Sequence, residues 1–186
     1  MRKLTHDEIS KNRSSLDNIH SVTKLPVTVL LNSIRSSYNV GSIFRTSDGA
    51  MIEKLILCGY TPHPPIDENN KGNKDVLKTA LGSTQSVKWE YIKNPIEAIK
   101  DIKAKGIKIC ALELTENSKP YSDTSLYKFP LCLVVGNEIT GVSQDVLDLC
   151  DYSIEIPQYG IKQSLNVAVA YGIAIFELRK IFDERD

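Results

Sequence analysis

Short runs of consecutive apolar residues recur along the chain, and polar or helix-patterned segments separate them. Five of these runs have the length and the β-branched content of buried strands. They cover residues 27–31, 55–58, 107–112, 131–135 and 152–156. A sixth strand is predicted over residues 87–91, where apolar and polar side chains alternate. Because most of the runs do not alternate, they are typical of a parallel sheet covered on both faces.

The segments between the strands have the apolar spacing of helices. We expect helices over residues 40–47, 75–81, 96–104, 142–149 and 164–182, and a short amphipathic helix over 6–20. Asn94 and Pro95 suit the start of the helix over 96–104, and Gly106 suits its end. Gly49 is expected to end or weaken the helix over 40–47. The alternation of strands and helices predicts an α/β fold, with a mostly parallel sheet and helices on both faces.

The segment over 164–182 is apolar nearly all round, so it requires burial on more than one side. Two interpretations stay open: a central helix in the core of one subunit, or a helix with one flank against a second subunit. The 186 residues suit one domain with a short extension. We divide them into an N-terminal helical extension, residues 1–25, and a main domain, residues 26–186.

The net charge is zero, but the charges are unevenly distributed. Residues 68–108 carry nine lysines against five acids, and residues 113–155 carry eight acids against two lysines. The neutral total therefore leaves room for one basic and one acidic face, although solvated helix surfaces give the same pattern.

Four cysteines are present without any CxxC pair, which argues against a zinc site and a secreted disulfide framework: Cys58, Cys110, Cys132 and Cys150. The N-terminus lacks the apolar stretch of a signal peptide, and the longest apolar segment, 165–178, is too short to cross a membrane. We therefore expect a cytoplasmic protein. Residues 59–65 contain three prolines and predict a loop, and the polar segment 67–74 is expected to be mobile.

Three polar segments follow predicted strands: residues 32–48, 136–141 and 157–166. Ligands of open α/β sheets bind just beyond the carboxyl ends of strands. Gly136 and Gly141 have the spacing of the two glycines in a phosphate-binding loop, but Val142 stands where the lysine of such a loop would be. The first strand is not followed by GxGxxG, and the three histidines lie far apart. A nucleoside triphosphate site, a dinucleotide fingerprint and a metal site are therefore not predicted.

Together, the three segments resemble the motifs of the SpoU/TrmH family of RNA ribose methyltransferases, within the knotted SPOUT group. The first motif is similar to NVGSIFRT at 39–46, the second to LVVGNE at 133–138 with Gly141, and the third to residues 156–170. The resemblance extends over residues 27–180. Gln158 and Ala168 stand where the family often has Met and Ser. The large N-terminal RNA-binding domain of many relatives has no counterpart here, which leaves the choice of RNA open.

The resemblance implies a C-terminal trefoil knot, a homodimer with the site near its interface, and S-adenosyl-L-methionine as methyl donor without a metal. It implies a donor site made by Leu112, Gly136, Asn137, Ile156, Ser164 and Leu165. It implies catalytic roles for Asn39, Arg45, Glu138, Ser164 and Asn166, and RNA contacts for Arg35 and Arg45.

Arg45 is the family's catalytic residue by this resemblance. A guanidinium stays protonated, with a pKa above about 12, so it is a poor base. It suits a bidentate grip on phosphate and stabilisation of the alkoxide that develops on the ribose. The sequence does not identify the group that accepts the proton of the ribose 2′-hydroxyl.

The other residues of the motifs each have more than one interpretation. Asn39 orients Arg45 or the RNA, or caps a helix. Glu138 organises the first motif or a partner chain. Ser164 is expected to cap the long helix, and Asn166 to fix a loop or contact the substrate.

The predicted function is methylation of an RNA ribose 2′-hydroxyl, with tRNA favoured because a compact chain suits a small structured substrate. A loop or splayed nucleotide is the expected target, since duplex RNA does not readily present its ribose. The alternatives are rRNA as substrate, a module that binds S-adenosylmethionine and RNA without catalysis, and an unrelated α/β nucleotide-binding enzyme.

Overall fold

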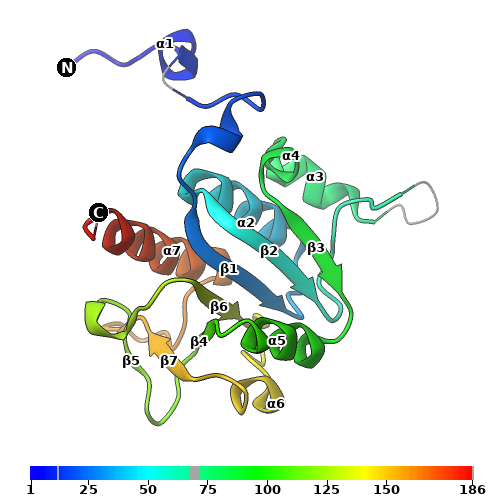
Figure 1. Cartoon of the computed structure of the whole chain (residues 1–186), viewed down its shortest axis with the longest axis vertical. Helices are drawn as coiled ribbons and strands as arrows, with labels where there is room; N and C mark the ends of the chain where they lie inside the picture. Colours follow the sequence, from blue (N-terminus) through cyan, green and yellow to red (C-terminus); the bar gives the residue numbers. More distant parts are fainter. Residues whose placement is uncertain (12, 68–71, 186) are drawn as a thin grey trace.

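A parallel sheet forms the centre of the molecule (Figure 1). The computed structural model describes residues 1–11, 13–67 and 72–185, without the side chain of His20. In this part of the chain, the strands are β1 (Leu25–Asn32), β2 (Ile52–Cys58), β3 (Trp89–Ile92), β4 (Lys108–Leu112), β5 (Lys119–Pro120), β6 (Leu131–Val135) and β7 (Tyr152–Glu155). Their order is β3-β2-β1-β6-β4-β7-β5, and the paired strands run parallel.

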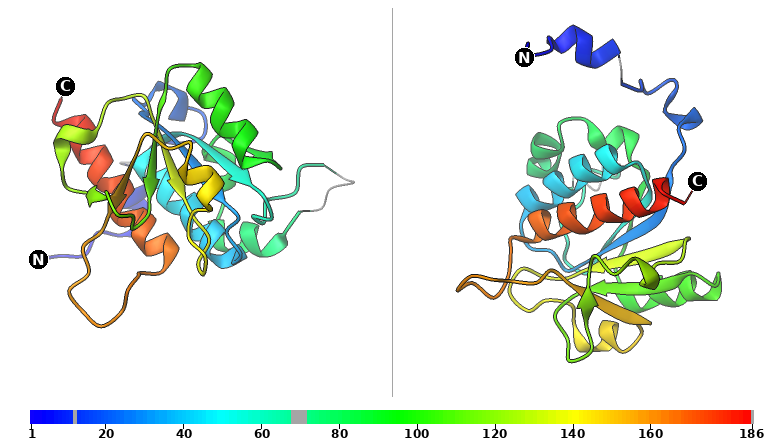
Figure 2. Two further views of the ribbon diagram at one scale, coloured as in Figure 1. Left: turned by 90° about the horizontal axis from the view of Figure 1, so that it is seen from below. Right: turned by 90° about the vertical axis from the view of Figure 1, so that its left-hand side faces the viewer.

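Helices cover both faces of the sheet, which confirms the predicted α/β architecture (Figure 2). They are α1 (His6–Lys11), α2 (Ser37–Ala50), α3 (Lys74–Ala80), α4 (Ser83–Ser86), α5 (Pro95–Ala104), α6 (Gln144–Leu147) and α7 (Val167–Asp183), with short 3-10 helices η1 (Ile19–Ser21) and η2 (Thr124–Leu126). One core cluster lies beneath α2, α3 and α7, and a second lies beneath α5 and α6.

Helices α2 and α7 lie side by side on one face of the sheet (Figure 2). Within this contact, the buried hydroxyl groups of Ser47 and Tyr171 form a hydrogen bond 2.7 Å long. The flank of α7 away from the core leaves Val169 and Phe176 about half exposed, at 53% and 50%. Within this chain, α7 is therefore buried on one side only.

Several predicted boundaries are wrong. The amphipathic helix over 6–20 is instead α1 followed, beyond residue 12, by turns and η1. Its apolar residues Ile9 and Leu16 stay exposed, at 43% and 53%, so they do not hold a longer helix against the core. Gly49 lies inside α2, which ends at Met51 in a left-handed conformation with φ of 53°. The helix predicted over 142–149 is reduced to α6. Of the segment predicted to be mobile, residues 68–71 lie outside the described residues.

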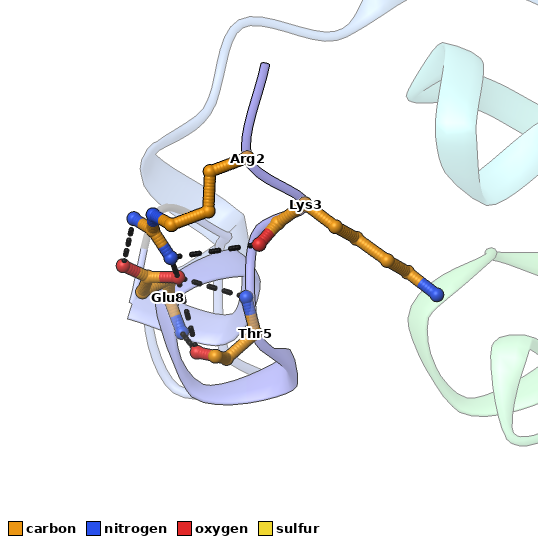
Figure 3. Close-up of polar contacts among 4 residues, drawn as sticks. All are labelled: Arg2, Lys3, Thr5 and Glu8. Atoms are coloured by element: carbon orange, nitrogen blue, oxygen red, sulfur yellow. Dashed lines mark hydrogen bonds and ion pairs between the residues drawn. The ribbon is translucent and has the colours of Figure 1, made fainter.

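The N-terminal segment before β1 extends away from the sheet (Figure 1). None of the residues of α1 is buried. Figure 3 shows its main polar cluster, in which the Glu8 carboxylate accepts hydrogen bonds from the Arg2 guanidinium and the Thr5 amide. These bonds, that of Arg2 first, lower the pKa of Glu8 to about 2. The side chain of Lys3 points away from this cluster (Figure 3).

The four cysteines are free thiols, and three of them are buried in the sheet. Burial raises the pKa of Cys58 to about 12, so this thiol remains an inert part of the core. No helix in the described part of the chain is long and apolar enough to cross a membrane.

Candidate functional site

A cavity of about 500 Å³ lies beyond the carboxyl ends of β4, β6 and β7. Its walls come from the three loops that follow these strands, at residues 112–114, 136–141 and 156–165. The six residues predicted to bind the methyl donor all line this cavity: Leu112, Gly136, Asn137, Ile156, Ser164 and Leu165. The volume lies within the range of small-molecule sites, about 300–1,000 Å³.

The loop after β6 closes into a tight turn against the cavity. The backbone groups of Asn137 and Gly141 exchange two hydrogen bonds, of 2.9 and 3.0 Å. A Cβ atom on Gly136 would lie 2.2 Å from the nitrogen of Val142, so only glycine fits there. Gly136 itself lines the cavity, so main chain forms this part of its wall.

The side chain of Asn137 holds this turn to the neighbouring strands. Its Nδ2 donates to the Ser33 carbonyl at 2.8 Å and to the Tyr60 hydroxyl at 2.7 Å. Its Oδ1 accepts from the amides of Ile139 and Thr140 at 2.8 and 3.0 Å. Since this buried amide group finds all these partners on the protein, and its backbone is bonded to Gly141, Asn137 serves to hold the loop in place.

Glu138 joins the second motif to the first. Its carboxylate accepts from the amides of Arg35 and Ser36 at 2.8 and 3.0 Å, and from Nδ2 of Asn39 at 2.7 Å. Burial acts to raise the pKa of Glu138, but the hydrogen bonds from Arg35, Asn39 and Ser36 together hold it below its ordinary value. The group therefore stays ionised at neutral pH and fixes the start of α2.

Asn39 extends this network to the third motif. Its Oδ1 accepts from Nδ2 of Asn166 at 3.1 Å. The Oδ1 of Asn166 in turn caps α7 by accepting from the amides of Ala168 and Val169. Glu138, Asn39 and Asn166 thus form one hydrogen-bonded chain across three segments that are remote in sequence.

The N-caps of α2 and α7 differ from the predicted ones, whereas Asn94 caps α5 as predicted. Ser36, not Asn39, is the N-cap of α2, because its hydroxyl accepts from the Asn39 amide. Asn166, not Ser164, caps α7, and α7 begins at Val167. Ser164 lies in the exposed loop that projects before α7 (Figure 2) and lines the cavity.

The two arginines predicted to contact RNA lie outside the cavity wall. Arg45 is exposed on α2, on the helix face that also carries Tyr38 and Ser42. Arg35 is exposed in the loop before α2, and only its backbone amide joins the Glu138 network. In the part of the chain that the structure describes, neither guanidinium has a hydrogen bond or an ion pair, so both are available to an anionic ligand.

Two residues at the site were missed by the sequence reasoning. Glu113 follows β4 and lines the cavity, and Tyr60 follows β2 and is held by Asn137. The available signal for Glu113 was an acid directly after an apolar strand, whereas Glu138 was predicted from its place in the second motif. Among the described residues, no group of three or more His, Cys, Asp or Glu side chains is placed to hold a metal ion.

Residues 26–176 match the sequence model of the SpoU rRNA Methylase family. The chain is 30% identical, over 95% of its length and 80% of the relative's, to the tRNA (guanosine(18)-2′-O)-methyltransferase of Aquifex aeolicus. It is 28% identical to the tRNA (guanosine(18)-2′-O)-methyltransferase of Escherichia coli K12, over 83% of this chain and 63% of that one.

Solved structures show the same similarity. The A. aeolicus TrmH/SpoU tRNA modifying enzyme superposes with a TM-score of 0.76 at 30% identity, over 91% of this chain and 83% of that chain. The AdoMet-bound rRNA methyltransferase of Sinorhizobium meliloti superposes with a TM-score of 0.72 at 26% identity, over 85% of this chain and 60% of that one. This chain therefore spans less than two thirds of some of its relatives.

Proposed function

The chain belongs to the SpoU rRNA Methylase family, and from this premise we propose that it methylates a ribose 2′-hydroxyl of tRNA with S-adenosylmethionine as donor. The family predicted from the three motifs is confirmed. The observation that carries the function is the bonded chain of Glu138, Asn39 and Asn166, which joins all three motifs beside one cavity.

The cavity has the chemistry that such a donor requires. Leu112, Ile156 and Leu165 give it apolar walls, and the turn at Gly136 presents backbone rather than side chain. Three carboxylates also line it, those of Glu113, Glu138 and Glu155, and none forms an ion pair with a described Lys or Arg. An excess of negative charge suits a cationic ligand. S-adenosylmethionine would supply an electrophilic methyl group on its sulfonium sulfur.

Arg45 acts on the RNA in this proposal. The network from Glu138 through Asn39 fixes the first turn of α2, and this helix presents Arg45 to solvent. The guanidinium binds a phosphate next to the target ribose and stabilises negative charge that develops on the 2′-oxygen. Arg35, exposed in the loop before α2, binds a second phosphate.

We also propose the trefoil knot. β7 lies between β4 and β5 in the sheet, although β5 and β6 precede it in the chain. The connection over residues 113–130 therefore passes around β7 before it returns to β6. This order supports the proposal that the segment after β7 threads through that connection on its way to α7.

The proposed assembly is a homodimer through the outer flank of α7. Val169 and Phe176 are half exposed there, and Leu165 just before the helix is 39% exposed. A contiguous apolar flank on one helix is typical of a protein–protein contact.

The proposed domain limits remain residues 1–25 for the extension and 26–186 for the methyltransferase domain. The proposed location is the cytoplasm.

Substrate and activity are tested in one assay. Purified protein is incubated with radiolabelled S-adenosylmethionine and separated pools of tRNA and rRNA. We expect label in tRNA, and a loss of at least about 100-fold in Arg45→Ala if the residue stabilises the transition state. Lys100→Ala, which removes an exposed cation from α5 on the opposite face of the sheet, retains activity.

The other outcomes identify the alternatives. Label in rRNA alone would contradict the choice of tRNA, and an rRNA methyltransferase is among the similar structures. Stabilisation by S-adenosylmethionine without label in any RNA would indicate the module without catalysis. The third alternative, an unrelated α/β nucleotide-binding enzyme, is wrong, because the chain belongs to this family.

A further inference from the structure

Glu113 is held in a fixed orientation at the wall of the cavity. Its backbone amide donates to the Ile154 carbonyl at 3.0 Å, which ties it to β7. Its carboxylate accepts from the Val142 amide through Oε2 at 2.8 Å and from the Leu114 amide through Oε1 at 3.0 Å. Since each oxygen is held by a different amide, the plane of the carboxylate is fixed before any ligand arrives.

The neighbouring loop is shaped to accommodate this carboxylate. Gly141 has a φ of 67°, and a Cβ atom on it would lie 2.2 Å from Oε2 of Glu113. A side chain at this position would therefore displace the carboxylate or the loop. The two loops after β4 and β6 are thus built around the Glu113 side chain.

The carboxylate of Glu113 has acceptor capacity left over. An ionised carboxylate accepts about four hydrogen bonds, and the described residues supply two to Glu113. Glu138, by contrast, receives three donors. Glu155 receives one donor from the described residues, the Ser118 hydroxyl at 2.7 Å, so its carboxylate is not fixed through both oxygens by backbone amides as that of Glu113 is. The remaining acceptor positions of Glu113 are one on each of two adjacent oxygens, which matches a ligand with two adjacent hydroxyl groups.

We propose that Glu113 is the sugar-binding residue of the cavity and accepts hydrogen bonds from the 2′- and 3′-hydroxyls of the donor's adenosine ribose. This inference rests on the proposed function, since it takes the cavity to hold an adenosine-containing donor. An acid at the end of a parallel strand that binds ribose hydroxyls is also found in dinucleotide-binding folds, where the same chemistry applies. In this position Glu113 selects ribose against deoxyribose and orients the nucleoside.

The test combines changes in the ligand with changes in the protein. Calorimetry measures the Kd of S-adenosylhomocysteine and of its 2′-deoxy and 3′-deoxy analogues for the full chain. Each missing hydroxyl leaves a charged acceptor unpaired, so we expect the wild type to bind each analogue at least about tenfold more weakly. In Glu113→Gln and Glu113→Ala, S-adenosylhomocysteine binds more weakly and the discrimination falls to about threefold or less.

The ratio of Kd values separates sugar binding from a structural role. A general disturbance of the loops would weaken all three ligands equally and leave the ratio unchanged, which would overturn the inference. Glu155→Gln is the matched control, because it alters another carboxylate of the same cavity, and it retains the discrimination of the wild type. Loss of discrimination in Glu155→Gln would show that Glu155, and not Glu113, binds the ribose hydroxyls, and would overturn the inference. If the wild type bound none of the three ligands, the proposed function itself would fail.

Discussion

A single carboxylate determines the arrangement of the first two motifs. The Glu138 carboxylate accepts hydrogen bonds from two backbone amides and one side-chain amide, all in the segment at the start of α2. Backbone amides before a helix have no partner within the helix and must find one elsewhere. Glu138 supplies that partner from a loop about 100 residues away along the chain. Its charge therefore links the wall of the cavity to the helix that carries Arg45.

The protonation of Glu138 predicts a pH dependence of stability. Because the folded pKa is lowered, the carboxylate contributes its full stabilisation above the ordinary glutamate pKa of about 4.3, and loses it as the pH falls through the lower folded value. We expect Glu138→Gln to reduce the free energy of unfolding by about 1–3 kcal/mol at pH 7, and the gap to the wild type to narrow below pH of about 4.

Urea unfolding at a series of pH values measures this gap. Glu116→Gln, which alters an exposed acid in the loop after β4, serves as the control with a gap near zero throughout. A gap for Glu138→Gln that stayed constant down to pH of about 3 would show that the ionised form contributes nothing extra.

At the scale of elements, the contact between α2 and α7 places the first and third motifs side by side. The only polar pair in the described part of this contact that is buried on both sides is Ser47 with Tyr171, whose exposed fractions are both 0%. Burial raises the pKa of the Tyr171 hydroxyl, so it remains neutral and bonded to Ser47. An unpaired hydroxyl in this position would be costly.

A double-mutant cycle tests the coupling of the two helices. Tyr171→Phe and Ser47→Ala should each lower the free energy of unfolding by about 1–3 kcal/mol, because each leaves the other hydroxyl without a partner. The double variant should be less destabilised than the sum, with a coupling of about 1 kcal/mol. Equilibrium urea unfolding of the four proteins gives these values. Strict additivity would mean that water or another group satisfies the remaining hydroxyl.

Much of the fold was predictable from the sequence, because strands of a parallel sheet that is buried on both faces appear as short continuous apolar runs. The limits of α7 were less predictable. Ser164 and Asn166 are both good capping residues, and their order does not reveal which one receives the first amides of the helix. The choice depends on Asn39, which bonds to Asn166 from a segment 127 residues away.

The polar network was predictable in its members but not in its bonds. Glu138, Asn39 and Asn166 each stood out as polar residues beside strand ends, whereas Ser36 as the cap of α2 depended on the local path of the backbone. Glu113 was overlooked because the residues around it resemble an ordinary acidic loop, and its position becomes meaningful only when β4 and β6 are adjacent.

At the scale of the whole molecule, the sheet order brings the ends of β4, β6 and β7 together and leaves the N-terminal segment apart from them. The body of the protein does not depend on this segment for its core, since α1 has no buried residue. Before η1, the segment carries four basic residues, Arg2, Lys3, Lys11 and Arg13, against the three acids Asp7, Glu8 and Asp17. Arg2 forms an ion pair with Glu8 at 2.7 Å, whereas Lys3 is exposed and its side chain points away from that pair (Figure 3).

Removal of residues 1–21 therefore separates folding from RNA binding. We expect the shortened chain to unfold at nearly the same temperature and to bind S-adenosylhomocysteine as the full chain does, because β1 and the cavity are intact. Its affinity for tRNA should fall, and the slope of log K against log salt should decrease by about one unit for each phosphate that the shortened chain no longer binds. Lys3→Ala should reproduce part of this decrease and Arg2→Ala should not, since Arg2 is already paired. An unchanged salt slope in the shortened chain would contradict this prediction. It would show that the N-terminal segment makes no phosphate contacts, and the face of α2 that carries Arg45 would then be the remaining candidate for RNA binding.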